Sequence, residues 1–250
     1  MADIDRSKRQ EIDREGIISE LEKTNSELDR FIYSVSHDLS APIKSIQGLI
    51  NLARMEPITE THSHYLSLIQ RSLKRQDEFI REIVEYGRNA RMPITIEKLD
   101  VLELINGIVE DLKYSETFEG TEVDVEINPD LRYLECDKVR LKIILNNLLS
   151  NAVKFKTKYK EKHNVRVTLT RNGAQFRLSI EDTGIGIEEK HLKNLFSMFF
   201  RATDQHPGSG IGLYIAHEAA KKMGCTIEVS SIVGKGSSFT LCSDNHAVSS

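Results

Sequence analysis

The first 90 residues contain very little glycine, and this feature constrains the fold most. Only three of the chain's 14 glycines lie there, at Gly16, Gly48 and Gly87. Glycine destabilises the interior of a helix and is frequent in turns. The distribution therefore predicts a segment of long helices followed by a turn-rich domain, with the boundary near residues 91–98.

A heptad pattern in the first segment supports long helices. Residues at alternating steps of three and four form one seam: Ile18, Leu21, Asn25, Leu28, Ile32, Val35 and Leu39. This spacing is typical of a coiled coil. The polar Asn25 at an a position either fixes the register of a parallel dimer or is a tolerated exception. We expect a coiled-coil signalling helix over residues 1–35.

A second helix is predicted after Pro57, and it completes a helical hairpin. Its seam has the same spacing: Leu66, Ile69, Leu73, Gln76, Ile80 and Ile83. Two copies of such a hairpin form a four-helix bundle when they dimerise. We therefore expect a dimerisation domain over residues 18–90 and a linker or hinge over residues 91–98.

Residues 99–243 have a different sequence pattern, which predicts short helices, strands and turns. We expect helices at 101–112, 138–156, 188–195 and 211–223, and strands at 123–127, 165–170, 175–180, 227–230 and 238–241. Asp137 is the expected N-cap of the long helix, and the Asn172-Gly173 pair predicts a hairpin. The predicted fold class is two-domain, α + α/β, in which an α/β sandwich with a mixed sheet is covered on one face by helices. The polar residues 244–250 are an expected disordered tail.

Composition excludes several classes of protein. The 34 Lys and Arg against 38 Asp and Glu give a net charge of -4, so a nucleic-acid partner is not expected. No apolar stretch is long enough to span a membrane. Three widely spaced cysteines, Cys136, Cys225 and Cys242, fit neither a disulfide framework nor a structural zinc site. We therefore expect a cytoplasmic protein with no membrane segment in this chain.

The first candidate for chemistry is His37. If Ile32 is an a position, His37 falls at f, which faces away from the partner helix. Pro42 removes the hydrogen bond that would reach the carbonyl of Asp38, so a bend is expected within a turn of the imidazole. An isolated exposed histidine is usually inert, so the interpretation depends on the second domain.

The second domain contains three motifs that suit a nucleotide. Asn147, Asn151 and Lys154 share one helix face, where amide oxygens can bind Mg²⁺ and the ammonium can face phosphate. Asp182 ends a strand, and its carboxylate can accept a hydrogen bond from the amine of adenine. The two glycines that follow allow the backbone to approach the base. The glycine-rich residues 208–213 precede a helix whose N-terminus can hold phosphate. They lack the spacing of a P-loop.

Taken in order, these motifs resemble those of the two-component sensor histidine kinases. Ser36-His-Asp-Leu-Ser-Ala-Pro-Ile43 resembles the phosphoacceptor box of that family, and Asn147 to Phe155 its N box. Asp182 to Gly186 looks like the first glycine box, Leu195 to Arg201 the F box, and Gly208 to Leu213 the second glycine box. Five boxes in the right order are jointly specific.

The resemblance implies a role for each matching residue. It implies that His37 accepts the γ-phosphoryl group of ATP and that Asp38 is the general base, although adjacent helical positions do not face each other, so Asp38 must reach the imidazole by a rotamer or by the bend. It implies that Asn147 holds Mg²⁺. It implies these ATP-binding residues: Asn147, Asn151, Lys154, Phe155, Asp182, Gly184, Gly186, Gly208, Gly210, Gly212 and Leu213. The resemblance thus makes residues 99–243 the ATP-binding catalytic domain.

The resemblance also implies partners and one missing activity. It implies a homodimer, a response regulator receiver domain as phosphoryl acceptor, and an upstream sensory domain that this chain does not contain. Many relatives have Thr or Asn four residues after the histidine, where the side chain orients water to dephosphorylate the regulator; here the residue is Ala41. We therefore expect weak phosphatase activity. Two alternatives stay open: an ATP-driven clamp with the same ATP-binding fold, and a catalytically silent dimeric scaffold.

Overall fold

The computed structural model describes residues 42, 44–46, 48–53, 60–91, 93–157, 162–172, 175–203 and 209–243. The predicted coiled coil at 1–35, the phosphoacceptor residues His37 and Asp38, Gly208 of the second glycine box and the tail at 244–250 lie outside the described residues. The chain divides into two compact units, Met1–Glu78 and Phe79–Ser250.

Helix dominates the described part of the first unit. Residues 44–46 and 48–53 are helical, and α2 (Glu60–Arg91) begins in this unit and continues beyond it. The Nε2 atom of His62 in α2 donates a hydrogen bond to the carbonyl of Ala53, at 2.7 Å. This contact joins the helical residues 48–53 to the first turn of α2.

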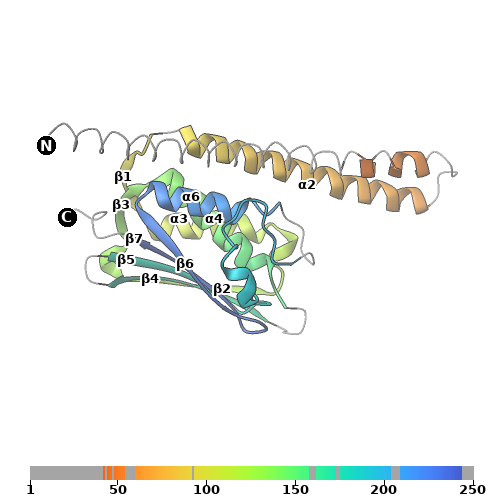
Figure 1. Ribbon diagram of the computed structural model, residues 1–250. Helices are drawn as coiled ribbons and strands as arrows, with labels where there is room; N and C mark the ends of the chain where they lie inside the picture. The colour runs from red at the N-terminus through yellow and green to blue at the C-terminus, as the bar shows by residue number, and fades with distance from the viewer. Residues whose placement is uncertain are drawn as a thin grey trace, which may run out of the picture. The chain divides into compact units, whose positions relative to one another are not determined.

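The second unit is built on a five-stranded sheet in the order β2-β4-β5-β7-β6 (Figure 1). The strands are β2 (Thr121–Ile127), β4 (His163–Asn172), β5 (Gln175–Asp182), β6 (Cys225–Ile232) and β7 (Gly236–Ser243). The pair β2 and β4 is parallel, whereas all other neighbours are antiparallel. The mixed sheet is therefore confirmed, and the hairpin predicted at Asn172 joins β4 to β5.

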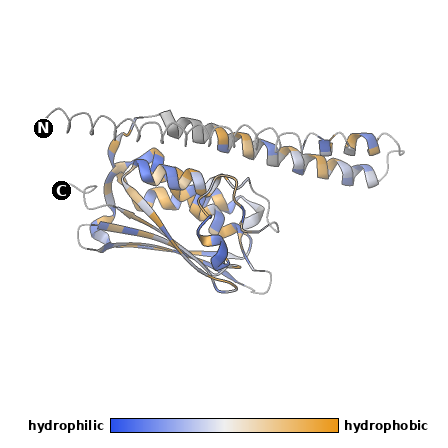
Figure 2. Ribbon diagram, viewed as in Figure 1, coloured by the Kyte–Doolittle hydropathy of each residue, from blue (hydrophilic) through white to orange (hydrophobic). Residues whose placement is uncertain are grey.

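Three helices cover one face of this sheet (Figure 1). They are α3 (Val101–Lys113), α4 (Lys138–Lys154) and α6 (Gly212–Lys222). Their hydrophobic residues and those of the strands form one core. In this core α4 buries its aliphatic residues Leu141, Ile144, Leu145, Leu148, Leu149, Ala152 and Val153. Figure 2 shows hydrophobic and hydrophilic residues alternating along the helices and strands of this unit. On β2 the alternate residues Glu122, Asp124 and Glu126 are exposed. At this strand the face of the sheet away from the helices is therefore polar.

A small antiparallel sheet of two strands, which the sequence pattern does not predict, lies beside the main one. β1 (Ile96–Asp100) pairs with β3 (Tyr133–Asp137), and Ile96 lies opposite Asp137. The predicted linker at 91–98 therefore includes the end of α2 and the start of β1. β1 has no alternation of apolar residues, because Leu99 is its one buried residue, so its pattern predicts no strand. Three very short helices, η1 (Glu116–Phe118), η2 (Pro129–Leu131) and α5 (Glu189–Leu192), complete the described elements.

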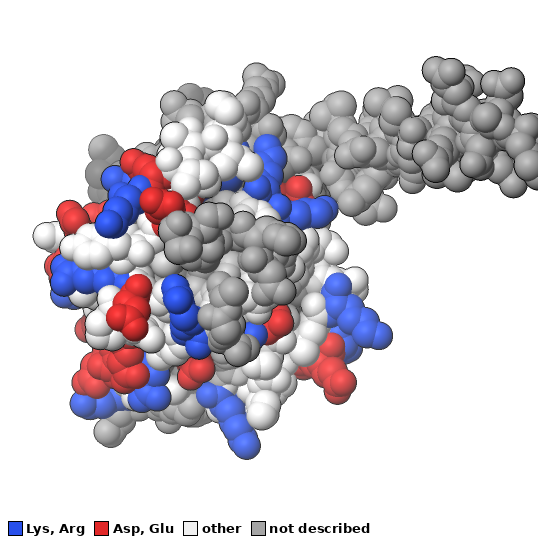
Figure 3. Space-filling view, turned by 90° about the vertical axis from the view of Figure 1, so that its left-hand side faces the viewer, with Lys and Arg blue, Asp and Glu red and all other residues white. Residues whose placement is uncertain are grey.

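The surface and the cysteines agree with the composition. On the face in Figure 3, basic and acidic side chains are interspersed, with no field of one sign among the described residues. In the same part of the chain no helix is long and apolar enough to cross a membrane. Cys136, Cys225 and Cys242 are buried thiols, and burial raises the pKa of the Cys136 thiol to about 12. Cys136 therefore remains a neutral thiol that packs in the core.

Replacing Gly236 with alanine should lower the free energy of unfolding of the second unit far more than replacing Gly234 with alanine. Both glycines have positive φ, +123° and +78°. A Cβ on Gly236 would lie 1.8 Å from the carbonyl oxygen of Asp182, whereas a Cβ on Gly234 meets nothing within 4 Å. We expect Gly236→Ala to cost about 3 kcal/mol or more and Gly234→Ala about 1 kcal/mol. Urea unfolding followed by circular dichroism measures both; equal losses would contradict this explanation.

Candidate functional site

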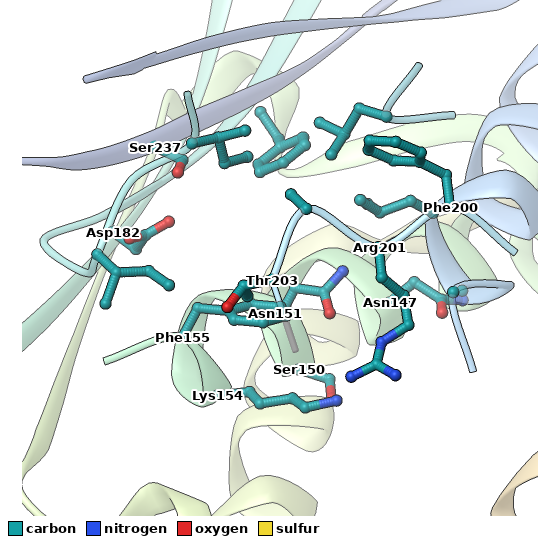
Figure 4. Close-up of a pocket in the computed structure, with 18 of the residues that line it drawn as sticks. Asn147, Ser150, Asn151, Lys154, Phe155, Asp182, Phe200, Arg201, Thr203 and Ser237 are labelled. Atoms are coloured by element: carbon teal, nitrogen blue, oxygen red, sulfur yellow. The ribbon is translucent and has the colours of Figure 1, made fainter. Parts of the chain in front are cut away.

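A cavity of about 390 Å³ lies in the second unit, bounded by α4, the end of β5, the segment after α5 and the start of α6. Figure 4 shows that four of its polar residues, Asn147, Ser150, Asn151 and Lys154, come from α4. Asp182 and Ser237 lie at the opposite side of the cavity. The cavity is therefore polar at both ends, with largely apolar walls between them.

The polar face of α4 is positioned by the capping of that helix. Asp137 is the N-cap, as predicted, and its carboxylate accepts a hydrogen bond from the N–H of Arg140 at 2.9 Å. From this start, Asn147, Asn151 and Lys154 fall on the side of α4 that is not buried against the sheet. Their positions follow directly from the 3.6-residue period of the helix.

The amide of Asn147 is held with its oxygen towards Gly212 at the start of α6. Its Nδ2 atom donates to the carbonyl of Ile143 at 2.9 Å. A Cβ on Gly212 would lie only 2.5 Å from its Oδ1 atom, so glycine is required for this close approach. The described residues contain no cluster of three His, Cys, Asp or Glu side chains that could hold a metal ion. A single amide oxygen suits Mg²⁺ that arrives bound to a triphosphate, because phosphate and water supply the other ligands.

Lys154 and Phe155 end α4 at the rim of the cavity. The Nζ atom of Lys154 lies over the ring of Phe155, 5.5 Å from its centre. The carbonyl of Phe155 accepts a hydrogen bond from the N–H of Ile185 at 3.0 Å. The end of α4 is thus joined to the glycine segment that follows β5, and the ammonium group lies at the polar side of the cavity.

Asp182 is oriented by its neighbours at the end of β5. One carboxylate oxygen, Oδ1, accepts a hydrogen bond from the N–H of Gly184 at 2.7 Å. Ser237 on β7 lies directly opposite Asp182 in the strand register. Because Asp182 lines the cavity with one oxygen held in this way, its carboxylate presents an acceptor to a ligand with an amine, such as adenine.

Apolar side chains form the walls between the two polar ends. They are Ile185, Ile187, Leu195, Phe200, Leu213, Val233 and Phe239. The ring of Phe200 packs against His191, with 5.6 Å between the ring centres. Glu188 also lines the cavity, and its hydrogen bond with Lys190 keeps the pKa of the Glu188 carboxyl below its usual value. The walls suit a flat, mostly apolar group such as a nucleobase.

The N-terminus of α6 faces the same cavity through Gly212 and Leu213. No side chain caps this helix at Ile211, whose own N–H donates to Oγ of Ser209 at 3.1 Å. The first N–H groups of a helix have no partner within the helix, and the helix dipole is positive at this end. An anionic group such as a phosphate is therefore favoured there.

The structure brings most of the predicted nucleotide residues together. Nine of them line the cavity: Asn147, Asn151, Lys154, Phe155, Asp182, Gly186, Gly210, Gly212 and Leu213. Gly184 is not among the lining residues, and a Cβ on it would lie 2.2 Å from the carbonyl oxygen of Phe155. Their assignment to individual parts of ATP remains a prediction.

Several further residues line the cavity without a nucleotide-binding role predicted from the sequence, although two of them, Phe200 and Arg201, lie within the F box. They are Ser150, Phe200, Arg201, Thr203 and Ser237. Ser150 lies three residues after Asn147, so helical spacing alone could have indicated it. Ser237 could not be found in this way, because its place beside Asp182 depends on the register of β7 against β5.

Two family models match the chain. The model described as "His Kinase A (phospho-acceptor) domain" matches residues 27–91. The model described as "Histidine kinase-, DNA gyrase B-, and HSP90-like ATPase" matches residues 136–246. The first match includes His37, and the second includes the whole polar face of α4 and both glycine segments.

Curated proteins with similar sequences include a respiration sensor and a phytochrome. The aerobic respiration control sensor protein ArcB of Escherichia coli strain K12 is 30% identical over 231 residues, which cover 88% of this chain and 29% of ArcB. Cyanobacterial phytochrome B of Nostoc is 29% identical over 226 residues, covering 88% of this chain and 30% of that protein. The chain thus spans about 30% of the length of these two relatives.

Solved structures show the same fold. The histidine kinase AdeS of Acinetobacter baumannii matches with a TM-score of 0.65 and 18% identity, over 84% of this chain and 98% of that chain. The histidine kinase ThkA, in complex with the response regulator protein TrrA, matches with a TM-score of 0.71 and 21% identity, over 90% of this chain and 64% of that chain. The two family models, together with the 30% identity to ArcB over 88% of this chain, show that the chain belongs to the two-component sensor histidine kinases and contains the catalytic core of that family.

Proposed function

We propose that this chain binds MgATP in the cavity, transfers the γ-phosphoryl group to His37 and passes it to an aspartate of a response regulator receiver domain. The observation that carries the proposal is the gathering of Asn147, Asn151, Lys154 and Asp182 around one cavity, in a chain whose residues 27–91 match the phosphoacceptor model. The similar full-length ShkA was crystallised in complex with AMPPNP, an analogue of ATP, and this supports ATP as the nucleotide.

The residues around the cavity suggest how MgATP is held. The carboxylate of Asp182 accepts a hydrogen bond from the amine of adenine. The apolar walls and Phe155 at the rim contact the base. The amide oxygen of Asn147 binds Mg²⁺, which neutralises charge on the phosphates when it is bound. Asn151, Lys154 and the N-terminus of α6 face the phosphates. Gly210 and Gly212 allow the backbone at that end to approach closely.

The transfer itself is an in-line displacement. An imidazole nitrogen of His37 forms a bond to the γ-phosphorus while the bond from that phosphorus to the bridging oxygen of ADP breaks. Asp38 takes the imidazole proton as general base. In the second step a carboxylate oxygen of the regulator attacks the same phosphorus and the bond from phosphorus to the imidazole nitrogen breaks. Asp38 returns the proton to the ring, so that His37 leaves as neutral imidazole. Positioning and charge neutralisation provide most of the catalysis, as in other phosphoryl transfers.

The proposal includes a homodimer formed by the helical segment. Leu66, Leu73 and Ile80 follow one another at seven-residue intervals on α2 and are 58%, 50% and 44% exposed. An exposed heptad stripe is typical of a helix that packs against further helices in a four-helix bundle. A response regulator as the second partner is supported by the complex of ThkA with TrrA. The proposed location is the cytoplasm, where thiols such as Cys136 stay reduced.

The experiment that tests this proposal is incubation of the full chain with γ-labelled ATP and Mg²⁺. We expect label on the protein that is stable in base and lost in acid, as is typical of phosphohistidine. ATP hydrolysis without labelled protein would instead support a conformational clamp of the kind that shares this ATP-binding fold. Failure to bind ATP at all would support a silent dimeric scaffold.

We expect this chain to dephosphorylate its regulator slowly, because Ala41 cannot hydrogen-bond the attacking water. The variant Ala41→Thr introduces a hydroxyl four residues after His37, and phosphate loss from the regulator should then rise by about 10-fold or more. The measurement follows a phosphorylated receiver domain without free nucleotide, so that transfer back to ADP is excluded. Rapid phosphate loss with the unaltered chain would contradict the expectation.

A further inference from the structure

A buried ion pair lies at the first turn of α4, far from the cavity. The guanidinium of Arg140 donates to the carboxylate of Asp137, and each side chain is only 3% exposed. By contrast, the ion pair of Arg132 with Asp100 leaves the arginine 51% exposed. Burying two charges costs a large desolvation energy, and apolar residues of the same size often stabilise a fold equally well. The pair therefore calls for an explanation beyond stability.

The remaining hydrogen bonds of the pair reach another segment. The second oxygen of Asp137, Oδ2, accepts a hydrogen bond from the N–H of Thr95 at 3.1 Å. The Nη1 atom of Arg140 donates to the carbonyl of Pro93 at 3.3 Å. Burial opposes ionisation of Asp137, but the N–H groups of Arg140 and Thr95 and the guanidinium outweigh it and lower the pKa of the carboxyl. The charged pair thus forms hydrogen bonds to the backbone at both ends of the segment 93–95.

These residues are the segment of chain between α2 and β1. The pairing of Ile96 with Asp137 continues the same attachment into the small sheet. From Asp137, α4 leads to Asn147 ten residues later, a distance of about 15 Å along a rigid helix. A displacement of residues 93–95 is therefore transmitted to the helix that bears the polar side of the nucleotide cavity.

We propose that Asp137 and Arg140 are positioning residues that fix the segment 93–95 to α4. The unit that binds the nucleotide is then constrained to move together with the chain that leads to it from the phosphoacceptor segment. This inference rests on the proposed transfer to His37. A locked attachment limits the orientations that the nucleotide can take as it approaches the imidazole. Released, the same unit still binds ATP but samples unproductive orientations, and misplacement of reacting groups is costly in rate.

The first test uses Thr95→Pro, which removes the N–H that Asp137 accepts but leaves the ion pair and the helix cap in place. Thr95→Ala is the matched control, because it removes the side chain and retains the N–H. In the full chain we expect Thr95→Pro to lower kcat for autophosphorylation by about 10-fold, with KM for ATP within about twofold of the unaltered chain. Thr95→Ala should behave as the unaltered chain. A purely structural role would instead lower thermal stability or nucleotide affinity.

The second test replaces both members of the pair, by Asp137→Asn with Arg140→Met. Asparagine still caps α4 through its one oxygen, and methionine fills the buried volume of the arginine. The amide nitrogen of the asparagine then faces the N–H of Thr95, so both attachments to residues 93–95 are lost. We expect the same fall in kcat at unchanged KM, and faster amide hydrogen exchange at Thr95.

The outcomes separate this inference from the proposed function. If the unaltered chain forms phosphohistidine and both variants keep its kcat, the inference is wrong and the proposed function stands. If the variants lose ATP affinity in parallel with kcat, the pair is structural and the inference is also wrong. If the unaltered chain binds ATP but forms no phosphohistidine, both proposals fail together.

Discussion

Replacing His37 with glutamine should eliminate the acid-labile, base-stable label from the chain while leaving ATP binding unchanged. Glutamine has a size close to that of histidine and can still form hydrogen bonds. Its amide nitrogen is not a nucleophile, because its lone pair is delocalised into the carbonyl, so no bond to the γ-phosphorus can form. The residues that line the nucleotide cavity belong to the second unit, between Phe79 and Ser250. Affinity for ATP should therefore be that of the unaltered chain.

The matched control is His64→Gln, which alters an exposed histidine of the same unit. The backbone carbonyl of His64 accepts a hydrogen bond from the hydroxyl of Ser67, and the substitution leaves this bond in place. We expect normal labelling in this variant. Label that persists in His37→Gln at the level of the control would show that another residue is the acceptor, and the assignment of His37 would have to be withdrawn.

Features of the fold that depend on neighbouring residues could be predicted from the sequence. The N-cap at Asp137 and the hairpin at Asn172 need only a few adjacent residues, and the structure has both. The face shared by Asn147, Asn151 and Lys154 needs only the helical period. Most of the predicted nucleotide-binding residues line one cavity, but they come from α4, the end of β5 and the start of α6, so their gathering was expected from the family resemblance and not from local sequence.

Features that depend on pairing between distant segments could not be predicted. Ile96 lies opposite Asp137 although 41 positions separate them in the sequence, and no alternation in β1 indicates a strand. Ser237 reaches the cavity because β7 pairs with β5. Asp137 illustrates the difference within one residue. Its capping oxygen follows from local sequence, whereas its bond to Thr95 depends on tertiary structure.

Replacing Asp182 with asparagine should weaken ATP binding by about 30- to 100-fold, corresponding to about 2–3 kcal/mol for a hydrogen bond to a charged group. The geometry explains why an isosteric change has so large an effect. Oδ1 of Asp182 accepts a hydrogen bond from the N–H of Gly184 at 2.7 Å. In the proposed complex the second oxygen accepts a hydrogen bond from the amine of adenine. An asparagine has one oxygen, so its NH₂ group must face either the N–H of Gly184 or the amine. Both arrangements place a donor against a donor.

The selectivity of the Asp182→Asn variant distinguishes this explanation from general damage to the unit. Guanine has a carbonyl where adenine has its amine, so the NH₂ group of asparagine can donate to GTP, and the preference for ATP over GTP should narrow. Glu181→Gln is the matched control, because Glu181 is exposed beside Asp182 on the same strand and should leave both affinities unchanged. Displacement of a fluorescent nucleotide by ATP and by GTP measures the affinities of both variants. Undiminished ATP affinity, or an equal loss of affinity for ATP and GTP, would mean that Asp182 does not form the hydrogen bond that recognises adenine.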